Sequence, residues 1–165
     1  RAVACQPEII LFDEAISSLD AHTQIQIMDL LHDLKEKLGL TYIFITHNLS
    51  VVNHIADEIA VMYLGHIVET IPGEDVSSHA VHPYTKALVG AQFSVHMDPT
   101  KKIESIESEA PSPLDVPVGC PFQNRCEHCT EKCKKEMPKL KEIAPGHEVA
   151  CFYVESMQNQ AEGGR

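Results

Sequence analysis

An unbroken apolar run that leads straight into two acids constrains this chain more than any other stretch. The run covers Ile9 to Phe12, and Asp13 and Glu14 follow it directly. Because polar and apolar residues do not alternate in it, the run favours a strand buried on both faces, as in a parallel sheet. Ligands of such sheets bind at the carboxyl ends of the strands, where paired carboxylates suit a metal-bound phosphate. A strand followed by a solvated acidic turn explains the acids equally well.

A helix and a second buried strand are expected next. Asp20 suits the start of a helix and Gly39 its end. Between them, apolar residues recur at helical spacing: Ile27, Leu30, Leu31, Leu34 and Leu38. Residues 41–45 (TYIFI) repeat the pattern of a buried strand, and His47 lies two residues beyond it. Strand, helix and strand form the crossover unit of a parallel sheet, so His47 is expected at the same sheet edge as the two acids.

The sequence after His47 predicts shorter elements. Residues 48–56 fit a short helix, and residues 58–69 fit a hairpin that turns at Leu64-Gly65. Two further helices are expected over residues 73–78 and 83–91. These elements complete a domain of alternating strands and helices.

Prolines then mark a boundary. Residues 110–117 (APSPLDVP) contain three prolines and cannot form a regular helix or a central strand. The expected division is a first domain over residues 1–94, a linker over 95–119, a cysteine-rich module over 120–155 and a disordered tail over 156–165.

The charge of the chain excludes one class of partner. Its formal net charge is −11 over 165 residues. Binding a nucleic-acid backbone needs a basic face, so no nucleic-acid partner is expected. No apolar run approaches the ~20 residues that cross a bilayer, and no secretion signal is visible, which favours an intracellular protein.

Five of the six cysteines gather in one short segment: Cys120, Cys126, Cys129, Cys133 and Cys151. In an intracellular chain such a cluster favours metal over disulfides, and a bound metal would organise a segment with little apolar core. The spacing differs from the two separated Cys-x-x-Cys pairs of a zinc ribbon. Thiolates from one short region suit an iron–sulfur cluster as well as zinc, and free thiols are the third alternative. Cys5 stands apart and is expected to be inert packing.

The first motifs resemble those of the ATP-binding subunits of ABC transporters. Residues 9–14 are similar to a Walker B strand, residues 17–20 (SSLD) to the D-loop, and residues 46–47 to the switch histidine. The resemblance implies an α/β fold. Its first part would be the C-terminal part of a P-loop NTPase domain with parallel strands and crossover helices, and a small, irregular cysteine-rich module would follow. It also implies in-line attack of water on the γ-phosphate of ATP, with Mg²⁺ neutralising charge.

The same resemblance implies a role for each site residue. Asp13 would hold Mg²⁺ through water, and Glu14 would act as general base, a role worth ~10²–10⁴-fold in rate. His47 would contact the γ-phosphate. Ser18 and Asp20 would belong to the D-loop, with Asp20 at the interface between two ATPase subunits.

The sequence also lacks parts that such an ATPase needs. A G-x-x-x-x-G-K-S/T loop, whose backbone amides and lysine cradle phosphates, does not occur in it, nor does an LSGGQ-type signature. The chain is therefore expected to be the C-terminal half of an ATPase domain with its tail. By itself it is expected to be inactive.

Two later stretches resemble one branch of this family, the oligopeptide and dipeptide importers. They are residues 82–88 (HPYTKAL) and the cysteine segment. Some members of this branch carry a four-iron four-sulfur cluster. The resemblance maps its ligands to Cys120, Cys126, Cys133 and Cys151, with Cys129 as an alternative ligand and Zn²⁺ as the alternative metal.

The importer resemblance implies partners and a location. The ATPase subunit would pair with a second ATPase subunit, dock on membrane permease subunits at the cytoplasmic face of the membrane, and serve an extracytoplasmic peptide-binding protein indirectly. Peptides, nickel and sugars all remain open as cargo. Two other classes also remain open: a non-transport ATPase of the same superfamily, and a metal-binding interaction module without its own ATPase activity.

Overall fold

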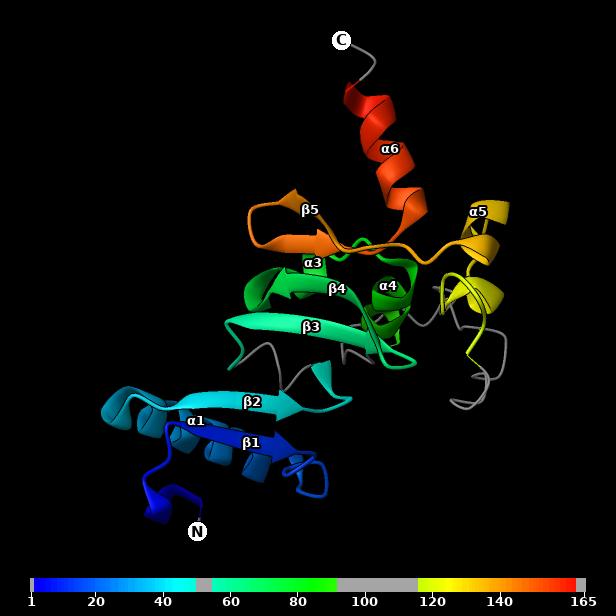
Figure 1. Cartoon of the computed structure of the whole chain (residues 1–165). Helices are drawn as coiled ribbons and strands as arrows, with labels where there is room; N and C mark the ends of the chain where they lie inside the picture. Colours follow the sequence, from blue (N-terminus) through cyan, green and yellow to red (C-terminus); the bar gives the residue numbers. More distant parts are fainter. Residues whose placement is uncertain (1, 50–54, 92–115, 163–165) are drawn as a thin grey trace, which may run out of the picture. The chain divides into compact units, whose positions relative to one another are not determined.

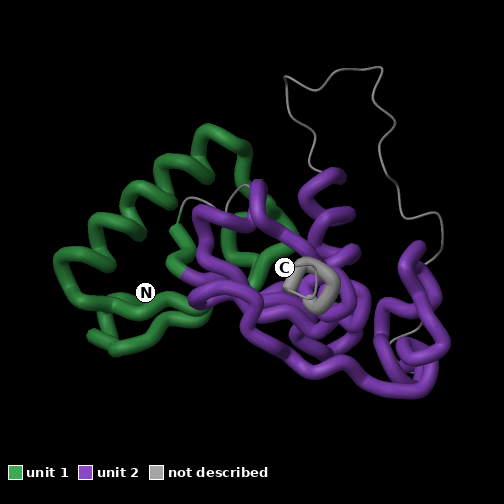
Figure 2. The backbone as a smooth tube through the Cα atoms, turned by 90° about the horizontal axis from the view of Figure 1, so that it is seen from above, with its two compact units in different colours: residues 1–57 green, residues 58–165 purple. Residues whose placement is uncertain are grey.

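The computed structural model describes residues 2–49, 55–91 and 116–162. The chain divides into two compact units, residues 1–57 (unit 1) and residues 58–165 (unit 2), which are coloured separately in Figure 2. The boundary between the units falls after residue 57, and the expected domain boundaries near residues 94 and 119 stay predictions. Most of the expected linker lies outside the described residues.

Unit 1 contains the strand–helix–strand arrangement that the sequence predicts. After a short 3-10 helix η1 (Ala2–Cys5), strand β1 (Ile9–Asp13) and strand β2 (Thr41–Ile45) pair in parallel, and helix α1 (Ala21–Leu38) connects them. Figure 1 shows α1 running along one face of this two-stranded sheet. The carboxyl ends of both strands therefore lie at one edge.

Both ends of α1 are capped as the sequence predicts. The Asp20 side chain accepts a hydrogen bond from the backbone N–H of Thr23 at the start of the helix. At the other end Gly39 adopts a left-handed conformation with φ 64°, and its N–H donates to the carbonyl of Lys35. A residue with a side chain is strained in that conformation, which explains glycine there.

The buried stripe of α1 differs from the expected one. Met28 and Leu31 are buried, whereas Leu30 and Leu38 are exposed. Ile16, Met28 and Leu31 form a buried cluster in unit 1, with these partly buried residues packed against it: Phe12, Ile27, Tyr42, Phe44 and Ile55. A sheet of two strands covers only a narrow part of the helix surface, so part of the apolar stripe stays uncovered.

Unit 2 is built on an antiparallel sheet of four strands in the order β3-β4-β6-β5 (Figure 1). Its strands are β3 (Glu58–Tyr63), β4 (His66–Pro72), β5 (Lys141–Ala144) and β6 (His147–Val149). The β3–β4 hairpin is predicted by sequence, and Leu64 and Gly65 form its turn with positive φ angles of 45° and 79°. The pairing of β4 with β6 brings the cysteine-rich segment into the same sheet.

Unit 2 also contains several helices. The 3-10 helix η2 (Gly73–Asp75), α3 (Val76–His79) and α4 (Pro83–Gly90) correspond to the two expected helices. In the cysteine-rich segment, η3 (Gln123–Arg125), α5 (Glu131–Lys135) and α6 (Phe152–Glu162) accompany the strands. This segment is thus less irregular than expected.

The structure bears on two further predicted segments, the tail and the helix after His47. The tail from residue 156, expected to be disordered, is helical as far as Glu162 because α6 continues into it. The expected helix over residues 48–56 falls largely on residues 50–54, outside the described part. Among the described helices, none combines the length and apolar character needed to cross a membrane.

Candidate functional site

Glu14 and His47 meet at the carboxyl edge of the parallel sheet. Nδ1 of His47 lies 3.1 Å from Oε1 of Glu14, and both side chains are largely exposed. An ionised carboxylate only accepts hydrogen bonds, so Nδ1 of His47 carries the proton of this bond. The structure therefore brings together two of the residues that the sequence predicts as neighbours.

Asp13 and the backbone of Glu14 complete this edge. Asp13 is the last residue of β1 and lies opposite Ile45 of β2. Glu14 has a positive φ of 48°, and its N–H donates to the carbonyl of Ile45 at 2.9 Å. A side chain in this left-handed conformation is strained by roughly 1–2 kcal/mol, and such strain is found preferentially at functional sites.

The turn after the acids is held by a residue that the sequence reasoning missed. Nε2 of Gln24, on α1, donates to the carbonyls of Ile16 and Leu19, at 3.0 and 3.2 Å. Ser17 Oγ donates to the carbonyl of Glu14 at 2.8 Å. Gln24 occupies a polar position beside the apolar stripe, and this is the only sequence signal that it offers.

The predicted D-loop residues lie at the surface. Ser18 is exposed. The carboxylate of Asp20 caps the start of α1, because Oδ1 accepts a hydrogen bond from the N–H of Thr23 at 3.0 Å and Oδ2 accepts one from Thr23 Oγ1 at 2.7 Å. These bonds from Thr23 lower the pKa of Asp20 below its ordinary value. The negative charge at this helix start is therefore stabilised.

The arrangement places an exposed carboxylate, a histidine and a second acid at one sheet edge. Glu14 is an exposed carboxylate that can accept a proton from water, and His47 orients it. Mg²⁺ typically takes one or two protein carboxylates and fills its other positions with water and phosphate oxygens. Asp13 and Glu14 fit that donor set, with Asp13 as the acid left free of the histidine contact.

The cysteines of unit 2 gather near one another. Burial raises the pKa of Cys120 and of Cys126 to about 11, and negative charge on the neighbouring thiols acts in the same direction. Burial also raises the pKa of Cys129 and Cys151 above the ordinary value. The backbone N–H of Cys120 donates to the carbonyl of Cys133 at 2.7 Å. Burial thus disfavours the thiolate form of Cys120, Cys126, Cys129 and Cys151.

The expected metal centre finds no support in this geometry. In the described ranges, no three histidine, cysteine, aspartate or glutamate side chains are placed so that they could hold a metal ion. The four-iron four-sulfur cluster and its zinc alternative are therefore not supported. Cys5, expected to be packed, is exposed.

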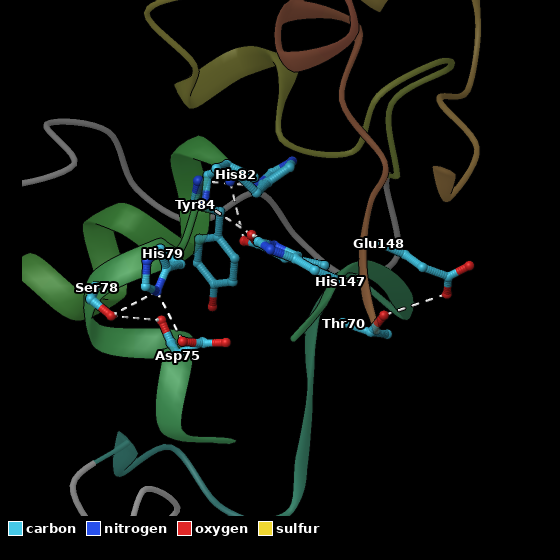
Figure 3. Close-up of polar contacts among 10 residues, drawn as sticks. Thr70, Asp75, Ser78, His79, His82, Tyr84, His147 and Glu148 are labelled. Carbon is cyan, nitrogen blue, oxygen red and sulfur yellow. Dashed lines mark hydrogen bonds and ion pairs between the residues drawn. The ribbon is translucent and has the colours of Figure 1, made fainter. Parts of the chain in front are cut away.

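A buried polar network lies in unit 2. The carboxylate of Glu69 on β4 accepts from His147 Nε2 of β6 at 2.7 Å, and from the backbone N–H groups of Val81 and His82 at 2.9 and 3.1 Å. Nδ1 of His82 in turn accepts from the N–H of Tyr84, which caps α4. Figure 3 shows His147 and His82 converging from β6 and from the start of α4. The network joins two strands and a helix.

Sequence comparison reveals relatives over nearly the whole chain. A di/tripeptide transport ATP-binding protein of Pseudomonas aeruginosa is 42% identical over 155 residues, which are 94% of this chain and 48% of that protein. A dipeptide transport ATP-binding protein of Haemophilus influenzae is 42% identical over 157 residues, 94% of this chain and 47% of that protein. A probable peptide ABC transporter ATP-binding protein of Sinorhizobium fredii is 44% identical over 153 residues, 92% of this chain and 43% of that protein.

These relatives are longer than the chain, which spans about half the length of the curated relatives it matches. A family profile also matches residues 68–133, and its description is "Oligopeptide/dipeptide transporter, C-terminal region". The match runs from within β4 to within α5 and includes Glu69, His82 and four of the clustered cysteines. With this match and with relatives 42% identical over 94% of its length, the chain belongs to the ATP-binding proteins of the oligopeptide/dipeptide transporter family.

Proposed function

We propose that this chain forms part of the ATP-hydrolysing subunit of an importer for oligopeptides or dipeptides. The observation that carries the proposal is the 3.1 Å contact between Glu14 and His47 beside Asp13, at the carboxyl edge of a parallel strand pair. Edges of this kind bind phosphate-bearing ligands in α/β proteins. The family of the chain supports ATP as that ligand, and the printed names of its relatives support peptides as cargo.

Each residue of the edge has its own role in the proposal. Asp13 holds Mg²⁺, directly or through water. Glu14 accepts the proton of the attacking water, and its bond to His47 fixes its orientation. The magnesium ion supplies charge neutralisation on the phosphates when ATP is bound. Ser18 and Asp20 lie on the surface turn that faces a second ATPase subunit.

The chain lacks a phosphate-binding loop of its own. Its sequence holds no G-x-x-x-x-G-K-S/T loop, so nothing in it cradles the phosphates near Asp13. The isolated chain is therefore inactive in our proposal, and activity requires the remaining part of the fold. The complete subunit works at the cytoplasmic face of the membrane with a second ATPase subunit and permease subunits, and a peptide-binding protein delivers the cargo.

The test is phosphate release by a chimera in which this chain replaces the matching part of the Haemophilus influenzae relative. We expect ATP hydrolysis by the chimera, and a loss of about 10²–10⁴-fold in kcat on Glu14→Gln, because the general base is removed. Glu36→Gln, which neutralises an exposed acid of α1, is the matched control and should retain full activity. A chimera whose hydrolysis survives Glu14→Gln would refute the assigned role.

The partners of the protein distinguish an importer subunit from a non-transport ATPase of the same superfamily. The chimera, expressed in cells that lack the relative, should co-purify with the permease subunits of the dipeptide importer. Active chimera without any permease would leave ATP hydrolysis in place and remove the transport function.

A further inference from the structure

The turn between β1 and α1, residues 14–20, carries Glu14 at its start. Of the side chains that the structure describes over this turn, that of Ile16 alone is buried, in the cluster with Met28 and Leu31. A turn with one buried side chain has few apolar contacts to fix its shape, so hydrogen bonds to its backbone must do so. These bonds therefore decide where the carboxylate of Glu14 lies.

The backbone of Glu14 is held on both sides. Its N–H donates to the carbonyl of Ile45 on β2 at 2.9 Å, and its own carbonyl accepts from the N–H of Ser17 at 3.2 Å and from Ser17 Oγ at 2.8 Å. The first bond fixes Glu14 to the parallel sheet, and the other two fix it to the middle of the turn. The left-handed φ of 48° at Glu14 persists only while its surroundings hold it. The place of Glu14 thus depends on the place of Ser17.

Gln24 ties the second half of the turn to α1. The carbonyl of Ile16 accepts from Nε2 of Gln24 at 3.0 Å and from the N–H of Leu19 at 3.2 Å. The carbonyl of Leu19 accepts from the same Nε2 at 3.2 Å. Long side chains on a helix point back toward its N-terminus, which directs the half-buried Gln24 side chain at the turn. Because the two carbonyls lie on either side of Ser17, Gln24 holds the residue that holds Glu14.

The chemistry of these bonds narrows which side chain can make them. Carbonyl oxygens only accept, so the NH₂ group of Gln24 faces them and gives one N–H to each. A glutamate of the same length would place a carboxylate against both carbonyls, and a methionine of similar shape has no N–H. A lysine reaches as far and carries three N–H donors. All four residues form helices about equally well, so exchanging them at position 24 changes the bonds and keeps the helix.

We infer that Gln24 is a positioning residue for Glu14: through the carbonyls of Ile16 and Leu19 it fixes the turn that sets the carboxylate. The inference rests on the proposed function for the role of Glu14 as general base. Gln24 acts on the rate through Glu14 and makes no contact with ATP. A reacting group that moves by about 1 Å can lose about 10²-fold in rate, so bonds two residues away from the acid matter to kcat.

The first experiment measures the turn in the full chain by NMR relaxation, without nucleotide. The backbone order parameters of Ser17 and Leu19 should be about 0.85, as in rigid backbone, and should fall below about 0.6 in Gln24→Met. Gln24→Lys should restore them, because the ammonium group donates to both carbonyls. Gln24→Asn, whose amide is one methylene short, should repeat the loss with a polar side chain. Circular dichroism shows that α1 is retained in each variant.

The second experiment measures kinetics in the chimera with the Haemophilus influenzae relative. Gln24→Met should lower kcat about 10–100-fold and leave the KM for ATP within about threefold, because the general base is misplaced while nucleotide binding is untouched. Gln24→Lys should return kcat to within about threefold of the unsubstituted chimera. Added to Glu14→Gln, Gln24→Met should lower kcat no further, since no general base is left to position.

A second glutamine on the same helix provides the matched control. Gln26 is exposed, and its Nε2 lies 3.2 Å from Nε2 of His22 within α1. Gln26→Met makes the same chemical change two residues further along the helix and removes no bond to the turn. It should leave the order parameters of Ser17 and Leu19 unchanged and kcat within about twofold.

The inference is wrong if Gln24→Met leaves the order parameters unchanged, if Gln26→Met lowers them equally, or if Gln24→Lys restores neither measurement. A raised KM at unchanged kcat would also contradict it, because Gln24 would then serve binding. An unsubstituted chimera that hydrolyses no ATP contradicts the proposed function instead, and the order parameters still decide whether Gln24 holds the turn.

Discussion

Two glutamate–histidine pairs in the described part of the chain have the same chemistry in opposite surroundings. In unit 1, Glu14 and His47 are 3.1 Å apart, and their side chains are 55% and 74% exposed. In unit 2, Glu69 and His147 are 2.7 Å apart, and their side chains are 0% and 8% exposed. Both pairs join residues far apart in the sequence. The difference in burial leaves the Glu14–His47 pair open to a ligand and makes the Glu69–His147 pair an internal contact.

Burial determines whether such a pair stabilises the fold or stays accessible for a reaction. An exposed pair adds only ~0–1 kcal/mol to stability, since water screens it. A buried carboxylate must have all its partners, and breaking such a pair leaves an uncompensated group that costs about 3–5 kcal/mol. Glu69 satisfies this condition with three N–H donors. Glu14 keeps oxygen atoms available to solvent, and a substrate needs that access.

The largest expected effect comes from removing the buried acid. Glu69→Ala should lower the free energy of unfolding by about 3–5 kcal/mol, because His147 and two backbone N–H groups lose their acceptor. Glu14→Ala should change it by less than about 1 kcal/mol. Urea denaturation of both variants measures the difference. Equal losses would remove the contrast between the two pairs.

The second prediction uses pH to probe the buried network. Burial lowers the pKa of His82 to about 4 from 6.5, against the opposing attraction of Glu69. The native protein thus keeps His82 neutral where the unfolded chain binds a proton. Stability should therefore fall as pH drops from about 6.5 to about 4, by about 1.4 kcal/mol per pH unit and about 3 kcal/mol in all.

A matched variant separates the contribution of His82 to the pH dependence of stability from the contributions of other titratable residues. His82→Asn keeps an acceptor at the N-cap of α4 for the N–H of Tyr84 but cannot titrate. Urea midpoints at several pH values should show a shallower decline for this variant between pH 6.5 and 4. An unchanged slope would assign the acid sensitivity to another group.

The third prediction concerns the backbone of the exposed site. Glu14 has a φ of 48°, which glycine adopts without strain. Glu14→Gly should therefore be more stable than Glu14→Ala by about 1 kcal/mol, although both remove the carboxylate. Thermal unfolding measures the difference. If the alanine variant is as stable, the site stores no backbone strain.

The smallest expected effect is the coupling within the exposed pair. A double-mutant cycle with Glu14→Gln and His47→Ala should give a coupling energy below about 1 kcal/mol in unfolding experiments. In the chimera, the same cycle on kcat should be strongly non-additive, because the two residues act together. Strong coupling in stability would make this pair structural, like that of unit 2.

Local signals predicted much of unit 1. The apolar runs gave β1 and β2, Asp20 and Gly39 gave the ends of α1, and the crossover rule placed His47 beside Glu14. These succeeded because each depends on neighbouring residues or on a single short connection. The buried stripe of α1 was only partly right, since the width of the covering sheet decides which apolar residues are buried.

Unit 2 shows where local signals end. Its first hairpin was predicted from Leu64-Gly65, yet the strand β6 that completes the sheet pairs Glu69 with Val149, far along the chain. No local periodicity encodes such a partner. The helical tail was missed because its polar composition resembles that of a disordered segment. Gln24 was missed because its carbonyl partners become visible only once the turn is folded.

The sequence by itself determined strands β1 to β4, the capped helix, the acids at a sheet edge and the cysteine-rich composition, because each follows from backbone preferences and side-chain chemistry within a short window. The tertiary structure decided that Glu69, His82 and His147 share one buried site and that β6 joins β4. Those outcomes depend on which distant surfaces exclude water from one another, and only the folded chain specifies that.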